Sequence, residues 1–274
     1  MISPADPVGV ESVESLAELG YDYIELSLAA LAALPEPAFA GVVERVNHSG
    51  IRCEACNNFF PRQVRLTGAQ ARLDHALAYA AGAMDRAARI GVDVIVFGSS
   101  GAKNVPPGFP PETAWKQVVD LLQHLGPLAE QRDLTIAIEP INRLEANLVT
   151  LAAEGLRLAR EVGHPNVQLL IDFYHLTLEK EALEIVTEAG PALRHLHFAE
   201  VNGRSFPTQI KEEYRDFFAR VRRTGYSGRC SIEALTADFP TDARRALAVL
   251  RQLVSEQIQP GAAGTENCAG KPEL

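Results

Sequence analysis

The sequence has little positive charge, few cysteines and no long apolar run. Lysine and arginine number 26 against 35 aspartates and glutamates, a formal net charge of −9, so the chain lacks the basic face with which nucleic-acid-binding proteins neutralise phosphates. The sequence contains no run of about 18 apolar residues, so it does not predict a membrane-spanning helix. The N-terminal residues lack the basic segment and the apolar segment that are typical of a secretory signal peptide. Four cysteines in a chain of this length do not indicate a fold stabilised by disulfides. We therefore expect a soluble protein of the cytoplasm, with no nucleic acid and no membrane as partners.

Short apolar runs rich in Ile, Val and aromatic residues alternate with longer helical patterns. Such runs are typical of strands buried on both faces. Their spacing of roughly 30–40 residues is the length of one βα unit, and several helical stretches end at a glycine just before the next run. The predicted strands are residues 21–26, 51–57, 92–98, 135–141, 167–172, 193–200 and 229–234.

Repeated βα units predict an α/β fold, a (β/α)8 TIM barrel. Seven units are visible, and only residues 1–7, with two prolines, precede the first predicted helix at 10–19; we expect the first strand to be short or irregular. An open, doubly wound sheet is the alternative, but no G-x-G-x-x-G follows an early strand. We expect one domain over residues 1–258 and a disordered tail, rich in Pro, Gly and Ala, over residues 259–274.

The last four predicted strands end in polar residues, where a barrel carries its chemistry. Alternate residues of a strand face opposite sides, which turns these groups toward the barrel axis and their large apolar neighbours toward the helices. Three carboxylates and an imidazole cannot stay buried without partners, and a divalent cation such as Mn²⁺, Mg²⁺ or Co²⁺ suits three oxygens and a nitrogen. Taken singly, each group could instead be satisfied by Arg, Lys or backbone partners. The predicted ligands are Glu139, Asp172, His197 and Glu233.

Polar residues on the early strands are read as structural. Glu25 faces inward by the same alternation, and we expect it to pair with an arginine beneath the site. Cys53 and Cys56 form a C-x-x-C, but three residues apart on a strand they should point to opposite faces. That geometry suits neither a zinc ligand pair nor a redox dithiol, so we expect ordinary buried thiols.

With these residues in place, the sequence resembles the xylose isomerase-like TIM barrels of the sugar phosphate isomerase/epimerase family. Within that family it is most similar to the ketose 3-epimerases of D-tagatose and D-psicose. The likeness runs from YDYIELS at Tyr21 to SIEA at Ser231. The four predicted ligands match the family's metal ligands in order and strand position, so the resemblance implies one divalent cation as cofactor, Mn²⁺ first, with Mg²⁺ or Co²⁺ as alternatives.

The resemblance also implies substrate-binding residues. Glu145 lies six residues past the first ligand, and His175 lies three past Asp172, at positions where the family contacts substrate oxygens. The family's arginine should lie six residues past the histidine ligand. Here Gly203 occupies that place and Arg204 follows it, so we expect Arg204 to bind substrate, while the identity of the sugar stays open.

The implied reaction is proton transfer beside a carbonyl through a metal-bound enediolate, as in a sugar isomerase or epimerase. Glu139 and Glu233 would act as the acid/base pair on opposite faces of a small sugar substrate. The same metal barrel could instead serve an aldose–ketose isomerase, or a dehydratase or lyase such as a C-glycoside deglycosidase acting on an oxidised glycoside. A homo-oligomer or a partner subunit is compatible with the sequence.

Two more distant functions fit the residues less well. An endonuclease IV-like enzyme uses the same barrel with three zinc ions and several more histidine ligands. Only His175, His195 and His197 lie near predicted strand ends, and the acidic net charge opposes DNA binding. A non-catalytic sugar or metal binder would not need a pair of glutamates on opposite faces.

Overall fold

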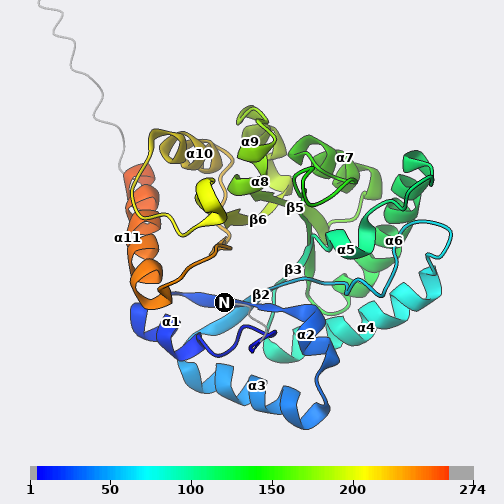
Figure 1. Cartoon of the computed structure of the whole chain (residues 1–274), viewed down its shortest axis with the longest axis horizontal. Helices are drawn as coiled ribbons and strands as arrows, with labels where there is room; N and C mark the ends of the chain where they lie inside the picture. Colours follow the sequence, from blue (N-terminus) through cyan, green and yellow to red (C-terminus); the bar gives the residue numbers. More distant parts are fainter. Residues whose placement is uncertain (1–4, 259–274) are drawn as a thin grey trace, which may run out of the picture.

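The computed structural model describes residues 5–258 and contains seven strands joined in one sheet. The strands follow one another in chain order, and every neighbouring pair is parallel. In Figure 1 they occupy the centre of the molecule, with helices around them. The strands are β1 (Tyr23–Ser27), β2 (Arg52–Asn57), β3 (Val94–Phe97), β4 (Thr135–Ile138), β5 (Val167–Asp172), β6 (Leu193–Phe198) and β7 (Cys230–Ile232).

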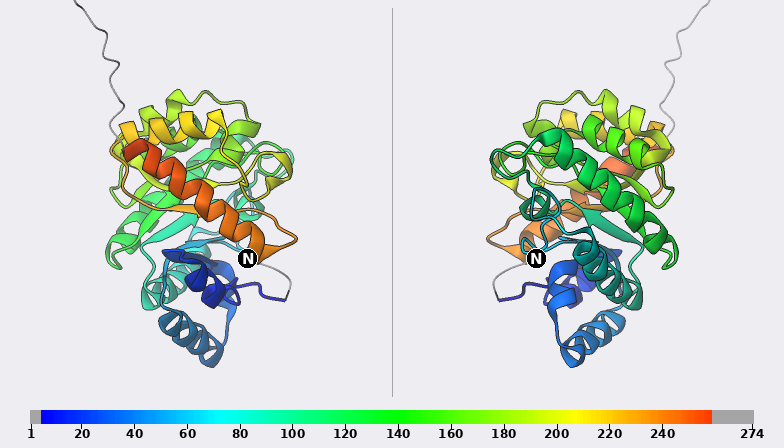
Figure 2. Two further views of the ribbon diagram at one scale, coloured as in Figure 1. Left: turned by 90° about the vertical axis from the view of Figure 1, so that its left-hand side faces the viewer. Right: turned by 90° about the vertical axis from the view of Figure 1, so that its right-hand side faces the viewer.

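Helices connect consecutive strands and cover the outside of the sheet, as the two side views in Figure 2 show. Within the described residues, none of these helices is both long enough and apolar enough to cross a membrane. The helices are α1 (Val13–Leu19), α2 (Leu28–Ala33), α3 (Glu36–Ser49), α4 (Leu73–Ile90), α5 (Ser100–Lys103), α6 (Pro111–Glu130), α7 (Ala152–Val162), α8 (Phe173–Leu178), α9 (Glu184–Ala189), η1 (Gly190–Ala192), η2 (Asn202–Arg204), α10 (Glu212–Arg223) and α11 (Phe239–Ile258).

The predicted TIM barrel is confirmed as a nearly closed ring of seven parallel strands. Every observed strand matches one predicted run, although β1 extends one residue past its predicted end. Residues 5–22 hold α1 and no strand; Pro7 there has no N–H to donate to a ladder. Residues 1–4 and 259–274, and with them the predicted tail, lie outside the described residues.

A bulge in β2 overturns one prediction. Ile24 pairs with Cys53 but Glu25 pairs with Ala55, so Glu54 is an extra residue in the ladder. One extra residue shifts the two-residue period of a strand by one position. Cys53 and Cys56 therefore pack in the same apolar layer between sheet and helices, and the prediction that they face opposite sides is wrong. Both are buried free thiols, as predicted.

Small or branched apolar side chains form one cluster in the barrel interior, whereas the layer between the sheet and the helices holds large side chains. Ala55, Val94, Ala137 and Leu170 are among the residues that form the inner cluster. Outside β5 and β6, aromatic rings from three helices or strands meet: Phe173 stacks on Phe198 at 4.8 Å between ring centroids, and Phe217 of α10 contacts Phe173 at 5.1 Å. This aromatic packing fixes the strands that carry the next group of residues.

We expect Phe217→Ala to lower the free energy of unfolding by about 3–5 kcal/mol, because it removes a fully buried ring and leaves a cavity. Urea unfolding followed by circular dichroism measures the change. Leu144→Ala is the control: Leu144 is 87% exposed, so its loss should change the free energy by no more than about 0.5 kcal/mol. Equal effects of the two substitutions would contradict this account of the core.

Candidate active site

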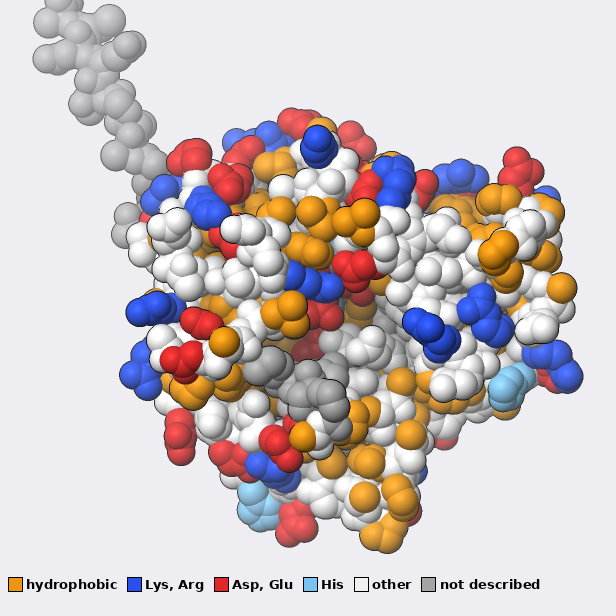
Figure 3. Space-filling model, in the orientation of Figure 1, with side chains coloured by type: hydrophobic (Ala, Val, Ile, Leu, Met, Phe, Trp, Pro, Cys, Tyr) orange, Lys and Arg blue, Asp and Glu red, His pale blue; other side chains and the backbone are white. Residues whose placement is uncertain are grey.

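The four predicted ligands meet at one end of the barrel, at or just after the ends of four adjacent strands. Glu139 follows β4, Asp172 ends β5, His197 lies on β6 and Glu233 follows β7. One ligand atom from each lies within 4.8 Å of the others. His197 Nδ1 is 3.1 Å from both Glu139 Oε1 and Glu233 Oε2. Figure 3 shows acidic side chains inside a hollow on this face of the molecule.

The strand alternation explains why these groups converge. His197 and His195 face the interior, whereas Leu196 and Phe198 pack into the apolar layer under the helices. A second bulge shifts the register between β5 and β6. Leu169 pairs with Leu193 but Leu170 pairs with His195, so Arg194 is the extra residue in β6. The inward direction predicted for both histidines is confirmed.

Burial and neighbouring charges shift the pKa values of the four groups in different directions. Burial raises the pKa of Glu139, against the opposing effect of His197, and burial raises the pKa of Asp172 to about 7. For Glu233 the burial effect is outweighed by His197 and Arg204, which lower its pKa to about 2. Burial alone would lower the pKa of His197, but Glu25 and Glu233 hold that pKa well above its usual range.

These residues fit a divalent cation. Asp172 Oδ2 is buried and has no hydrogen-bond partner within the described structure, although an isolated buried carboxylate oxygen is costly. Three carboxylates and one imidazole form a donor set that suits Mn²⁺, Mg²⁺ or Co²⁺. Gly98 leaves the room that Glu139 needs, because a Cβ atom on Gly98 would stand 2.1 Å from Glu139 Oε2.

Arg204 reaches the same centre despite its displacement by one position. Gly203 and Arg204 both take positive φ values, 72° and 46°, and this left-handed turn accompanies the extra residue. The guanidinium lies 2.8 Å from Glu233 and 3.8 Å from Asp172, and it stacks over the ring of Tyr174 at 4.8 Å. The positively charged guanidinium of Arg204 therefore lies directly beside the carboxylates of Glu233 and Asp172.

The other two predicted substrate contacts are joined by a residue that the sequence reasoning missed. Asn142 is fully buried, and its amide group lies 2.8 Å from Glu145 Oε1 and 2.7 Å from His175 Nδ1. His175 Nε2 lies 3.5 Å from Asp172 Oδ2, and burial lowers the pKa of His175 to about 3. The signal for Asn142 was its place in the polar stretch directly after β4.

The predicted partner of Glu25 is wrong. Glu25 contacts His195 and His197 rather than an arginine. Lys103 is a second buried charge near the site: its ammonium donates to the backbone carbonyls of Gly98 at 2.5 Å and Glu139 at 3.4 Å. Burial lowers the pKa of Lys103 to about 8. Lys103 thus ties together the ends of β3 and β4.

A cavity of about 360 Å³ adjoins Glu233 and Arg204. It lies between β1 and β7, which have no backbone pairing with each other among the described residues. That volume falls in the range of small-molecule sites. Much of its wall is apolar or aromatic: Leu16, Tyr21, Tyr23, Phe206, Ile232, Leu235 and Phe239.

The sequence of the chain matches the profile of one known protein family. Residues 13–253, nearly the whole described chain, match the profile of the family described as xylose isomerase-like TIM barrel. The chain belongs to this family.

Curated relatives of this xylose isomerase-like barrel act on sugars. An L-ribulose 3-epimerase of Methylomonas sp. (strain DH-1) is 29% identical over 122 residues, which cover 44% of this chain and 42% of the relative. A 3-dehydro-D-guloside 4-epimerase of Escherichia coli (strain K12) is 30% identical over 139 residues, 50% of this chain and 53% of the relative. The matches thus span about half or less of each curated relative.

A solved structure of D-psicose 3-epimerase in the presence of D-fructose has a TM-score of 0.79 to this xylose isomerase-like chain. It covers 88% of this chain and 92% of its own, at 21% sequence identity. At that identity the likeness shows the fold alone.

We expect Gly98→Ala to weaken binding of Mn²⁺ by roughly tenfold or more, the scale seen when a group supporting a ligand is lost. The added methyl group would take the space of the Glu139 carboxylate. Isothermal titration calorimetry measures the dissociation constant. Gly82→Ala is the matched control, because nothing lies within 4 Å of its added Cβ; equal dissociation constants for the two variants would refute this role of Gly98.

Proposed function

We propose that this chain is a divalent-metal-dependent sugar epimerase of the ketose 3-epimerase type. The observation that carries the proposal is the pair Glu139 and Glu233, each with a carboxylate oxygen 3.1 Å from the same ring nitrogen of His197. They come from the outer two of four adjacent strands, with Asp172 and His197 between them. The sugar epimerases among the curated relatives support the same class of reaction.

The cation would be held by Glu139, Asp172, His197 and Glu233, and it would supply positive charge beside the substrate oxygens that become negative. Mn²⁺ is the metal we propose first, with Mg²⁺ or Co²⁺ as alternatives. Inversion at a carbon next to a carbonyl needs a proton removed on one face and returned on the other. We assign these two transfers to Glu139 and Glu233.

Three further side chains would bind and orient the sugar. Arg204 stands against Glu233 and Asp172, so a hydroxyl or carbonyl oxygen entering there would meet a fixed guanidinium. His175 has a depressed pKa and stays neutral near pH 7; its Nδ1 accepts from Asn142, so its Nε2–H can donate to a sugar oxygen. Glu145, anchored by Asn142, would accept from a sugar hydroxyl.

A second candidate uses the same residues on an oxidised glycoside, in an epimerase or a lyase such as a C-glycoside deglycosidase. The cavity beside Glu233 favours it, because apolar and aromatic side chains such as Tyr21, Phe206 and Phe239 suit an aglycone rather than a free sugar. One E. coli relative is named for a glycoside substrate.

The test is proton exchange with solvent deuterium. Chelator-treated chain, with and without Mn²⁺, is incubated in D2O with free ketoses and with 3-keto glycosides, and deuterium is followed by NMR. We expect deuterium at C3 of a ketose only when the ion is present. Glu139→Gln and Glu233→Gln should each slow exchange by about 10²–10⁴-fold, the usual contribution of one acid/base group.

Glu36→Gln is the matched control, because Glu36 is on the surface of α3 and pairs with Arg86 and Arg89. Its exchange rate should equal that of the unaltered chain. Deuterium at C1 or C2 alone would replace the epimerase proposal with an aldose–ketose isomerase. Reaction confined to the glycosides, with or without loss of the aglycone, would establish the second candidate.

A further inference from the structure

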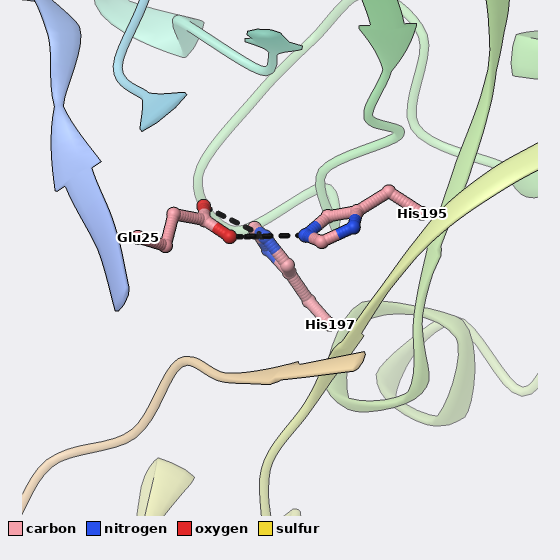
Figure 4. A group of neighbouring side chains, drawn as sticks. All are labelled: Glu25, His195 and His197. Atoms are coloured by element: carbon pink, nitrogen blue, oxygen red, sulfur yellow. Dashed lines mark hydrogen bonds and ion pairs between the residues drawn. The ribbon is translucent and has the colours of Figure 1, made fainter. Parts of the chain in front are cut away.

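A second polar cluster lies in the barrel interior on the far side of His197 from the predicted ligands. Glu25 of β1 extends across the interior toward β6, with its side chain only 8% exposed. Its Oε1 lies 3.0 Å from His197 Nε2, and its Oε2 lies 3.0 Å from His195 Nε2. Figure 4 shows a nitrogen of each ring directed at the Glu25 carboxylate. Ser231 of β7 donates to Glu25 Oε2 at 2.5 Å, and Tyr23 contacts Ser231 at 2.6 Å.

The hydrogen-bond directions in this cluster follow from the carboxylate. An ionised carboxylate only accepts hydrogen bonds, so His195, His197 and Ser231 all donate to Glu25. Ser231 thereby uses its single proton, and the hydroxyl of Tyr23 must donate to Ser231. The donated protons of His195, His197 and Ser231 all point toward Glu25.

This assignment decides which nitrogen of His197 is free for a ligand. When an ion displaces the Nδ1 proton that faces Glu139 and Glu233, the proton on Nε2 stays directed at Glu25 and Nδ1 offers its lone pair. Nδ1 is the atom that lies 3.1 Å from Glu139 and Glu233. A carboxylate behind the ring also makes the nitrogen in front a better donor to a cation.

We propose that Glu25 is a positioning residue, which holds His197 through Nε2 in the orientation and tautomer that offers Nδ1 to the cation. Ser231 and His195 hold Glu25 in place through its other carboxylate oxygen, Oε2. The inference rests on the proposed function, because it needs Glu139, Asp172, His197 and Glu233 to bind the ion.

The same three residues could in principle bind a second ion, since Glu25, His195 and His197 each offer an atom within 4.8 Å of the others. The contacts favour hydrogen bonds instead. The distances of 3.0 Å are those of N–H···O bonds, and Ser231 and the two rings already occupy the carboxylate oxygens. Ion stoichiometry separates the two possibilities.

The cluster also joins β1 to β6 and β7 by side chains, so a purely structural role must be separated from a positioning one. Glu25→Gln keeps the shape but replaces the carboxylate with a weaker, neutral acceptor. We expect the dissociation constant for Mn²⁺, measured by calorimetry without any sugar, to rise by about 10- to 100-fold. Tyr23→Phe is the control: it removes a hydroxyl across the same β1–β7 contact and leaves Glu25 against His197, so ion affinity should stay unchanged.

A spectroscopic readout accompanies the affinity. In the chain loaded with diamagnetic Zn²⁺, ¹⁵N NMR of the histidine rings should show His197 protonated at Nε2, and Glu25→Gln should shift that N–H signal because an amide oxygen accepts more weakly. Should Glu25→Gln fail to fold, Ser231→Ala takes its place; it removes one donor to Glu25 and should weaken ion binding by a smaller factor.

Unchanged ion affinity in the substituted chain would overturn the inference, as would an equal loss in Tyr23→Phe or two ions bound per unaltered chain. Failure of the proposed function is distinct: the unaltered chain would bind one ion and exchange no proton of any sugar. An unaltered chain that takes up no ion would overturn both.

Discussion

Like charges gathered at one end of a barrel repel, and the arrangement of this chain turns on the imidazole that separates them. His197 has a carboxylate of Glu25 behind it and those of Glu139 and Glu233 in front. Among the residues that the structure describes, only Arg204 and a protonated His197 supply positive charge at hydrogen-bonding distance from Glu233. The aromatic packing outside β5 and β6 holds the backbone of His197 while the polar contacts hold its ring. His197 therefore belongs both to the candidate site and to the wall of the barrel.

Much of this arrangement could be predicted because it follows the two-residue period of a strand. The inward turn of Glu139, His197 and Glu233, and their convergence, needed only strand order and the rule that parallel strands end on one face. The two-residue alternation no longer predicts side-chain direction once an extra residue is inserted in the strand. Glu54 is such a residue, and nothing local in RCEACN marks it as a bulge; its pairing with Arg229, 175 residues away, is a tertiary contact.

Contacts across the barrel were the part that sequence could not supply. Alternation told which way Glu25 points but not which of the facing strands its carboxylate meets, so an arginine was expected where two histidines lie. Asn142 was missed for the same reason, since its value lies in joining Glu145 to His175 across a loop and a helix. The reach of Arg204 likewise depended on the positive φ of Gly203, which its position after the histidine ligand did not reveal.

The contact between β1 and β7 limits which of its residues can be substituted independently during evolution. Among the described residues these two strands are joined by the side chains of Glu25, Tyr23 and Ser231 and not by a backbone ladder. A backbone ladder uses groups that every residue except proline carries, but a contact made of side chains ties its residues to one another. A sequence that lost Asp172 or Glu139 would therefore still need Glu25 and its partners, or a jointly changed set, to keep β1 and β7 joined.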